Sequence, residues 1–174
     1  MRGCYTEHEQ YPEMSGLVVP VCTPFDENDA IEEGMYVKHL GLLAGQGVKR
    51  ILVNGTTAEF FSLTVQERKR LMELSRRHFD GVLIFHAGCD GLAQTTELAK
   101  YGQDSGADAI AAIAPYYMAS VSEQGMIDYF NALADTIKVP FILYNFPKHT
   151  QNGFTPEILS KIKHFGMKDS SADL

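Results

Sequence analysis

The sequence repeats one local pattern, Gln46-Gly47-Val48-Lys49-Arg50-Ile51-Leu52 and again Ser105-Gly106-Ala107-Asp108-Ala109-Ile110-Ala111. Each copy combines the polar end of a helical segment, a glycine in the cap position and a buried strand. A helix that leads into a buried strand is typical of a β-α unit in a parallel sheet. The repeat therefore predicts an α/β fold built from such units.

The rest of the chain continues this alternation. Short apolar runs that fit strands occur at residues 17–21, 51–53, 82–85, 109–113 and 141–144, with a weaker run at 164–168. Between them lie segments of helical period at 32–46, 64–79, 91–105, 122–137 and 155–163. Thr64 with Glu67 has the pattern of a capping box, and Thr155 precedes Pro156 as an expected N-cap. Consecutive units of this kind build either a doubly wound open sheet or a barrel.

The first β-α turn argues against an open sheet that binds nucleotides. It reads Val21-Cys22-Thr23-Pro24-Phe25 and lacks the Gly-x-Gly-x-x-Gly pattern that cradles phosphates. No Walker-type loop occurs elsewhere in the sequence.

Composition and charge exclude several classes of partner. The 174 residues carry 15 Lys+Arg and 22 Asp+Glu, a formal net charge of −7, and 45% of them are hydrophobic. Without a Lys/Arg cluster larger than local pairs such as Arg76-Arg77, we expect no nucleic-acid partner. No apolar run reaches the roughly 18 residues of a membrane span, and the polar start, residues 1–10, does not resemble an export signal. We expect no membrane partner.

The cysteines and histidines predict neither a disulfide framework nor a metal site. Cys4, Cys22 and Cys89 are odd in number and far apart, which favours a reducing cytoplasm. The six histidines lack ligand spacing. The acidic stretch at residues 26–29 lacks the glycine and terminal glutamate of a calcium loop, so we expect a solvated turn there.

Reactive side chains in parallel β-α folds collect where strands end, and Lys168 ends the last predicted strand. A lysine that points into a barrel is shielded from water, which favours the neutral amine that attacks carbonyls. Lys168 is thus a candidate Schiff-base nucleophile. The alternative is an exposed lysine after a frayed strand.

Two further strand ends carry candidate groups. Tyr144 could shuttle protons for Schiff-base chemistry, or it could be a core tyrosine with a satisfied hydroxyl. Gly55-Thr56-Thr57 offers hydroxyl and amide donors that could hold a carboxylate, or it could be a polar turn chosen for its geometry.

Three segments together resemble the motifs of the dihydrodipicolinate synthase and N-acetylneuraminate lyase family. They are Gly55-Thr56-Thr57-Ala58-Glu59, Tyr144-Asn145-Phe146-Pro147 and Gly166-Met167-Lys168-Asp169-Ser170-Ser171, and the resemblance runs from about Gly16 to the C-terminus. It implies a TIM (β/α)8 barrel, of which this chain would hold about the first six β-α units. It also implies a class I aldolase or lyase that forms a lysine imine with pyruvate or another small 2-oxo acid, without a metal or other cofactor.

The resemblance assigns roles to individual residues. Lys168 matches the Schiff-base lysine and Tyr144 the general acid/base tyrosine. Thr56 and Thr57 match the pair that holds the carboxylate of the 2-oxo acid, with the Thr57 hydroxyl also relaying protons. Tyr117 is similar to the tyrosine that such enzymes lend across a dimer interface, which implies a homo-oligomer, a dimer or a tetramer.

Three departures from the family pattern bear on the substrate. Ala58 replaces a usual glycine, which should narrow the backbone options of its turn. The interval from Tyr144 to Lys168 is short, so the last strand or the helix before it should be abbreviated. His149 stands where synthases that condense pyruvate with aspartate semialdehyde have an arginine for the second carboxylate, and bidentate capture is lost there.

The missing arginine favours cleavage of a 2-keto-3-deoxy sugar acid or a related hydroxy-2-oxo acid. The alternative within the family is 4-hydroxy-tetrahydrodipicolinate synthase. An alternative of another class is a barrel fragment that acts as a non-catalytic binding or assembly module.

The length fits a partial barrel. A complete (β/α)8 barrel usually takes about 250 residues, whereas 174 residues hold six predicted strands. We expect residues 1–15 to be an N-terminal extension and residues 16–174 an incomplete barrel domain from a longer parent, with unpaired edges at its first and last strands.

Overall fold

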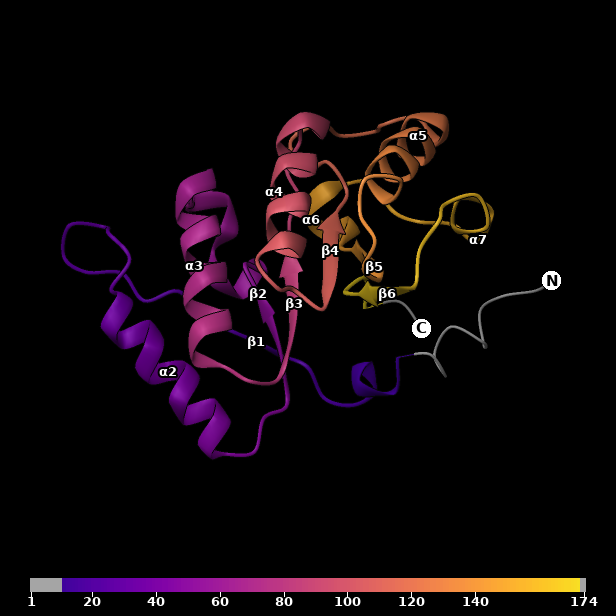
Figure 1. Ribbon diagram of the computed structural model, residues 1–174. Helices are drawn as coiled ribbons and strands as arrows, with labels where there is room; N and C mark the ends of the chain where they lie inside the picture. The colour runs from indigo at the N-terminus through magenta and orange to yellow at the C-terminus, as the bar shows by residue number, and fades with distance from the viewer. Residues whose placement is uncertain (1–10, 173–174) are drawn as a thin grey trace. The chain divides into compact units, whose positions relative to one another are not determined.

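The computed structural model describes residues 11–172 (Figure 1). These residues form two compact units. The first unit holds residues 11–85 and 105–108, and the second holds residues 86–104 and 109–172. Most of the predicted N-terminal extension, residues 1–10, lies outside the described residues, as do residues 173–174.

Three parallel strands belong to the first unit: β1 (Val19–Pro20), β2 (Arg50–Val53) and β3 (Val82–His86). His86, the last residue of β3, belongs to the second unit. The register places Ile51 beside Val19 on one side and beside Leu83 on the other. β1 is shorter than the predicted run because Leu17 is exposed and Pro20 has no N–H for a ladder bond.

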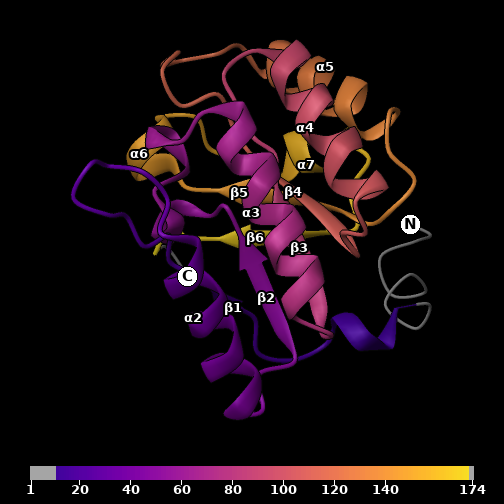
Figure 2. The same cartoon turned by 60° about the vertical axis from the view of Figure 1, so that its left-hand side comes forward.

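The helices of the first unit, α2 (Glu33–Gly45) and α3 (Val65–His78), lie side by side (Figures 1 and 2). The predicted capping box is present at the start of α3. Thr64 Oγ1 accepts the Glu67 N–H at 3.2 Å, and the Thr64 N–H donates to Glu67 Oε2 at 2.8 Å. Local side chains thus satisfy two backbone donors that the helix itself leaves unpaired.

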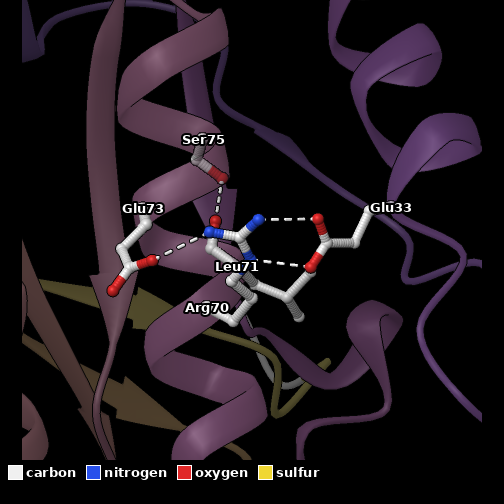
Figure 3. A network of polar contacts seen from close by, with 5 residues as sticks. All are labelled: Glu33, Arg70, Leu71, Glu73 and Ser75. Carbon is white, nitrogen blue, oxygen red and sulfur yellow. Dashed lines mark hydrogen bonds and ion pairs between the residues drawn. The ribbon is translucent and has the colours of Figure 1, made fainter.

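Polar contacts join α2 to α3. The Arg70 guanidinium binds both carboxylate oxygens of Glu33, at 2.6 and 2.7 Å, and also reaches Glu73 of its own helix at 3.1 Å (Figure 3). In the buried part of the contact, the Tyr36 hydroxyl lies 2.8 Å from Ser75 Oγ, which itself donates to the Leu71 carbonyl. Burial raises the pKa of Tyr36, so the phenol keeps its proton.

The second unit repeats the arrangement with strands β4 (Ala109–Ile113), β5 (Phe141–Asn145) and β6 (Gly166–Asp169), which are parallel and pair in chain order. All of β4 is buried. The accompanying helices are α4 (Leu92–Asp104), α5 (Glu123–Ala134), α6 (Pro147–Thr150) and α7 (Pro156–Leu159).

The last helix is the main departure from the predicted elements. α7 ends at Leu159, whereas the pattern predicts a helix up to residue 163. Asn131 of α5 explains the difference, because its amide donates to the Lys161 carbonyl at 2.9 Å and accepts the Lys163 N–H at 2.8 Å. A side chain distant in sequence therefore binds backbone groups that would otherwise extend the helix. The short α7 agrees with the abbreviation expected between Tyr144 and Lys168.

Short helical turns complete the described chain. Sequence reasoning missed α6 and three 3₁₀ turns, namely η1 (Pro12–Met14), η2 (Thr56–Ala58) and η3 (Phe60–Ser62). The repeated cap glycines are confirmed: Gly47 and Gly106 have φ angles of +81° and +92°, a region that side chains with a Cβ rarely adopt. None of the helices in the described part of the chain combines the length and the apolar character of a bilayer span.

The Tyr36–Ser75 contact generates a stability prediction. Tyr36→Phe removes the hydroxyl from a buried, paired site, and we expect a loss of about 1 kcal/mol in the free energy of unfolding. Urea denaturation followed by circular dichroism measures it. The control is Tyr117→Phe, which removes an exposed hydroxyl and should change stability by less than about 0.5 kcal/mol. Equal losses for the two variants would contradict the assigned role of the buried pair.

Candidate active site

The second unit brings the predicted lysine and tyrosine together. In the register of β5 and β6, Tyr144 pairs with Lys168. The Lys168 ammonium lies 3.6 Å from the centroid of the Tyr144 ring, over its face, and donates to Ser170 Oγ at 2.8 Å. Lys168 is half-buried, which lies between the enclosed lysine of a barrel interior and the exposed surface lysine that the sequence left open.

Aromatic rings hold Tyr144 on its other sides. The side chain is 2% exposed, and its ring stacks on Phe146 at 5.9 Å between centroids. The His86 ring meets it edge-on at 5.8 Å and an angle of 82°. Sequence reasoning counted His86 only among the scattered histidines, although its position at the end of β3 could have singled it out.

His149 reaches this cluster through Phe146. It lies exposed on α6, and its ring packs against Phe146 at 4.3 Å between centroids. Phe146 in turn stacks on Tyr144. The structure thus brings Lys168 into direct contact with Tyr144, whereas His149 is linked to Tyr144 only through Phe146.

A polar pair occupies the opposite face of the same two strands. Asn145 donates from its amide to Asp169 Oδ1 at 2.7 Å, and the two residues are register partners. The Ser171 hydroxyl and N–H also donate to the Asp169 carboxylate. These donors, the Ser171 hydroxyl first among them, hold the pKa of Asp169 below its ordinary value.

Tyr117 projects from a loop whose backbone is held firmly. The side chain is 85% exposed. Asp90 Oδ1 accepts the N–H groups of Tyr116 and Tyr117 at 2.7 and 2.8 Å. Buried Asn152 donates to the carbonyls of residues 115 and 118 and accepts the N–H of residue 121. Sequence reasoning missed both clamping residues, of which Asp90 alone follows a strand end.

The predicted carboxylate-binding residues lie in the first unit. Gly55 is buried and precedes η2, Thr56 is half-buried and Thr57 is exposed. The turn closes through hydrogen bonds from Ala58 N–H to the Gly55 carbonyl and from Glu59 N–H to the Thr56 carbonyl, both at 3.0 Å. The Thr57 side chain is therefore accessible, as a substrate-binding hydroxyl must be.

Ala58 does not restrict the backbone of this turn in the way that the sequence predicts. The left-handed residue is Glu59, with φ 55° and ψ 41°, and not Ala58. Ala58 is buried, and its carbonyl accepts the Thr23 hydroxyl at 2.9 Å. Position 58 thus needs a small side chain rather than the backbone freedom of glycine.

The acidic stretch forms the expected exposed turn. Asp26 Oδ1 accepts the N–H groups of Asn28 and Ala30 at 2.8 and 3.0 Å, and these bonds lower the pKa of Asp26. Within residues 11–172, no group of three or more His, Cys, Asp or Glu is arranged to hold a metal ion. Over the same residues neither Cys22 nor Cys89 is in a disulfide, and Cys4 lies outside them.

Comparison with known proteins decides the family. The model of the dihydrodipicolinate synthetase family matches residues 13–174. The chain belongs to this family. The match confirms the predicted fold class, a partial TIM (β/α)8 barrel, of which the described residues hold six parallel strands and the helices between them.

Individual relatives agree. The chain is 31% identical to a 4-hydroxy-tetrahydrodipicolinate synthase of Staphylococcus haemolyticus, over 91% of this chain and 55% of that protein. It matches the crystal structure of YagE, a family member from E. coli K12 in complex with pyruvate, with 30% identity and a TM-score of 0.84, over 91% of this chain and 55% of that one.

A 2-keto-3-deoxygluconate aldolase from Picrophilus torridus matches with 27% identity and a TM-score of 0.84, over 91% of this chain and 59% of that one. The chain spans about half the length of the curated relatives it matches.

The Asp169 hydrogen bonds generate a second prediction. Ser171→Ala removes the hydroxyl donor, so the pKa of Asp169 should rise toward its ordinary value. A carboxyl whose pKa is lowered by folding stabilises the fold at pH values above its ordinary pKa. This contribution to stability disappears as the pH falls through the lowered pKa. A carboxyl-carbon NMR titration of Asp169 measures the change. Ser160→Ala, which touches no carboxylate in the described hydrogen bonds, is the control, and an unchanged titration in Ser171→Ala would refute the assignment.

Proposed function

We propose that this chain is part of a class I aldolase or lyase that forms an imine between Lys168 and the carbonyl carbon of a 2-oxo acid such as pyruvate. The observation that carries the proposal is the Lys168 ammonium over the ring of Tyr144, 3.6 Å from its centroid, on paired ends of adjacent strands. Family membership supports it, as does the pyruvate named in the YagE complex.

In the proposed reaction the imine acts as the electron acceptor. The neutral Lys168 amine attacks C2 of the 2-oxo acid, and the carbinolamine loses water to give the C=N bond. In the cleavage direction the C4 hydroxyl loses its proton, the C3–C4 bond breaks, and its electron pair moves to the imine nitrogen as an enamine. An aldehyde leaves, C3 gains a proton, and water releases pyruvate. Because the protonated imine accepts the electrons, this chemistry needs no metal or redox cofactor.

Tyr144 is the proposed proton shuttle for these steps. A general acid/base must be held within reach of the reacting group. The packing of its ring against Phe146, His86 and Lys168 restricts its orientation before substrate arrives. Such preorganisation reduces the cost of reaching the reactive geometry.

The remaining predicted residues would hold the substrate. We assign the carboxylate of the 2-oxo acid to Gly55, Thr56 and Thr57, with Thr57 relaying protons. We assign Tyr117 to the site of a second copy, in a homodimer or tetramer. The exposed side chain on a firmly held loop suits a residue lent to a partner.

For the second substrate we favour a 2-keto-3-deoxy sugar acid or a related hydroxy-2-oxo acid. His149 cannot form the bidentate contact that an arginine makes with a carboxylate. The similarity to the 2-keto-3-deoxygluconate aldolase supports this choice. The similarity to the Staphylococcus haemolyticus synthase supports the alternative, 4-hydroxy-tetrahydrodipicolinate synthase activity.

A non-catalytic binding or assembly module is the alternative of another class. A reducing cytoplasm remains our proposed setting for the protein, on the basis of its cysteine usage.

Imine formation is directly testable. Borohydride added to the chain with pyruvate should attach a reduced pyruvyl group to Lys168, identified by peptide mass spectrometry. Lys168→Met should abolish the adduct, whereas Lys161→Met, at an exposed lysine after α7, should retain it. Tyr144→Phe should slow adduct formation by roughly 10²-fold or more. A folded wild-type chain without an adduct at Lys168 would overturn the proposal.

Substrate choice has a separate test. We expect cleavage of 2-keto-3-deoxygluconate to exceed condensation of pyruvate with aspartate semialdehyde, and His149→Arg to shift the ratio toward the semialdehyde by about tenfold. A coupled pyruvate assay and a semialdehyde-consumption assay measure the two rates. Faster condensation by the wild type would favour the synthase alternative, and an adduct without turnover of either substrate would favour the binding module.

A further inference from the structure

His86 lies at the end of β3 in a niche that fixes its protonation and its orientation. The side chain is fully buried, and its Nε2 accepts the backbone N–H of Ile113 at 3.2 Å. A nitrogen that accepts a hydrogen bond carries a lone pair, so the ring is neutral and its proton is on Nδ1.

Gly88 completes the niche. A Cβ at this position would lie 2.8 Å from His86 Nε2 and 2.8 Å from the backbone nitrogen of Ile113. Such distances are shorter than any normal contact, so only glycine leaves room for the histidine ring beside the strand. The backbone at residues 88 and 113 therefore determines where this ring lies.

The anchored ring then contacts the proposed acid/base residue. Ile113 is the register partner of Tyr144, so the hydrogen bond that holds His86 comes from the strand next to Tyr144. The His86 and Tyr144 rings pack in a T-shaped arrangement with 82° between their planes, a geometry favoured by the charge distribution of aromatic rings. The Lys168 ammonium lies over the face of the Tyr144 ring, where the negative charge of the π system attracts a cation.

We propose that His86 is a positioning residue for Tyr144. Its Nε2 anchors the imidazole to the Ile113 N–H, and the T-shaped packing of the two rings holds the phenol at the angle from which its hydroxyl serves the Lys168 imine. Phe146 contacts the same ring, but it lies after the end of β5 and is itself only half-buried. The inference rests on the proposed function, since it assigns His86 to the same site.

Two substitutions separate positioning from mere structural support. His86→Gln retains an acceptor for the Ile113 N–H but removes the aromatic edge. His86→Phe retains an aromatic edge but leaves the Ile113 N–H without its acceptor, so it should lower the melting temperature. A purely structural role predicts a functional Gln variant and an impaired Phe variant, whereas positioning of Tyr144 predicts the reverse order.

The rate of pyruvate adduct formation under borohydride is the readout. We expect His86→Gln to be slower than wild type by about tenfold, with the half-saturating pyruvate concentration changed less than about twofold. His86→Phe should recover to within about threefold of the wild type. His164→Gln, at a histidine that contacts the Ile162 carbonyl before β6, is the matched control and should react at the wild-type rate.

A Gln variant at the wild-type rate, or a Phe variant slower than the Gln variant, would overturn the inference. Ring-proton NMR of tyrosine-labelled chain, with Tyr144 assigned through Tyr144→Phe, tests it independently of activity. We expect the Tyr144 signals to shift in His86→Gln and to return toward the wild-type positions in His86→Phe. If the wild type forms no adduct, the proposed function fails, and unchanged Tyr144 signals in His86→Gln would refute the positioning as well.

Discussion

The candidate site depends on the register of two parallel strands, β5 and β6. This register places Tyr144 beside Lys168 on one face of the sheet, where ammonium and ring make contact. Because side chains alternate between faces with a period of two, a shift of one residue would move Lys168 to the other face. The neighbouring register of β4 with β5 brings Ile113 beside Tyr144 in the same way, and with it the anchor of His86.

Sequence reasoning succeeded where the determinants are local. The buried strand β4 has the predicted bounds, because an uninterrupted apolar run of five residues suits a strand covered on both faces. The capping box of α3 and the cap glycine Gly47 are likewise properties of a few adjacent residues. The strand-end rule also singled out Lys168 and Tyr144, which the structure places in contact and whose catalytic roles stay predictions.

The features that sequence reasoning missed depend on residues distant in the chain. The early end of α7 requires Asn131, nearly 30 residues before it, to bind the backbone that follows. The loop that carries Tyr117 is held by Asp90 and Asn152 from two other segments. The contact of His86 with Tyr144 combines three strands. No local pattern encodes such pairings, because hydrogen-bonding side chains of this kind are common and their partners are set only by the packed fold.

The two faces of the β5–β6 pair carry different side chains, Tyr144 with Lys168 on one face and Asn145 with Asp169 on the other. Under the proposed function the amine of Lys168 reacts, so a strong ion pair on its own face would hinder it, and the register needs another source of specificity. The Asn145 amide and the Asp169 carboxylate bind each other across the same two strands on the opposite face. A slip of either strand by one residue would separate them and leave the amide of Asn145 buried without this acceptor, a cost that an apolar pair would not impose. The polar pair therefore favours the alignment of Lys168 with Tyr144 without contacting the amine that we propose as the nucleophile.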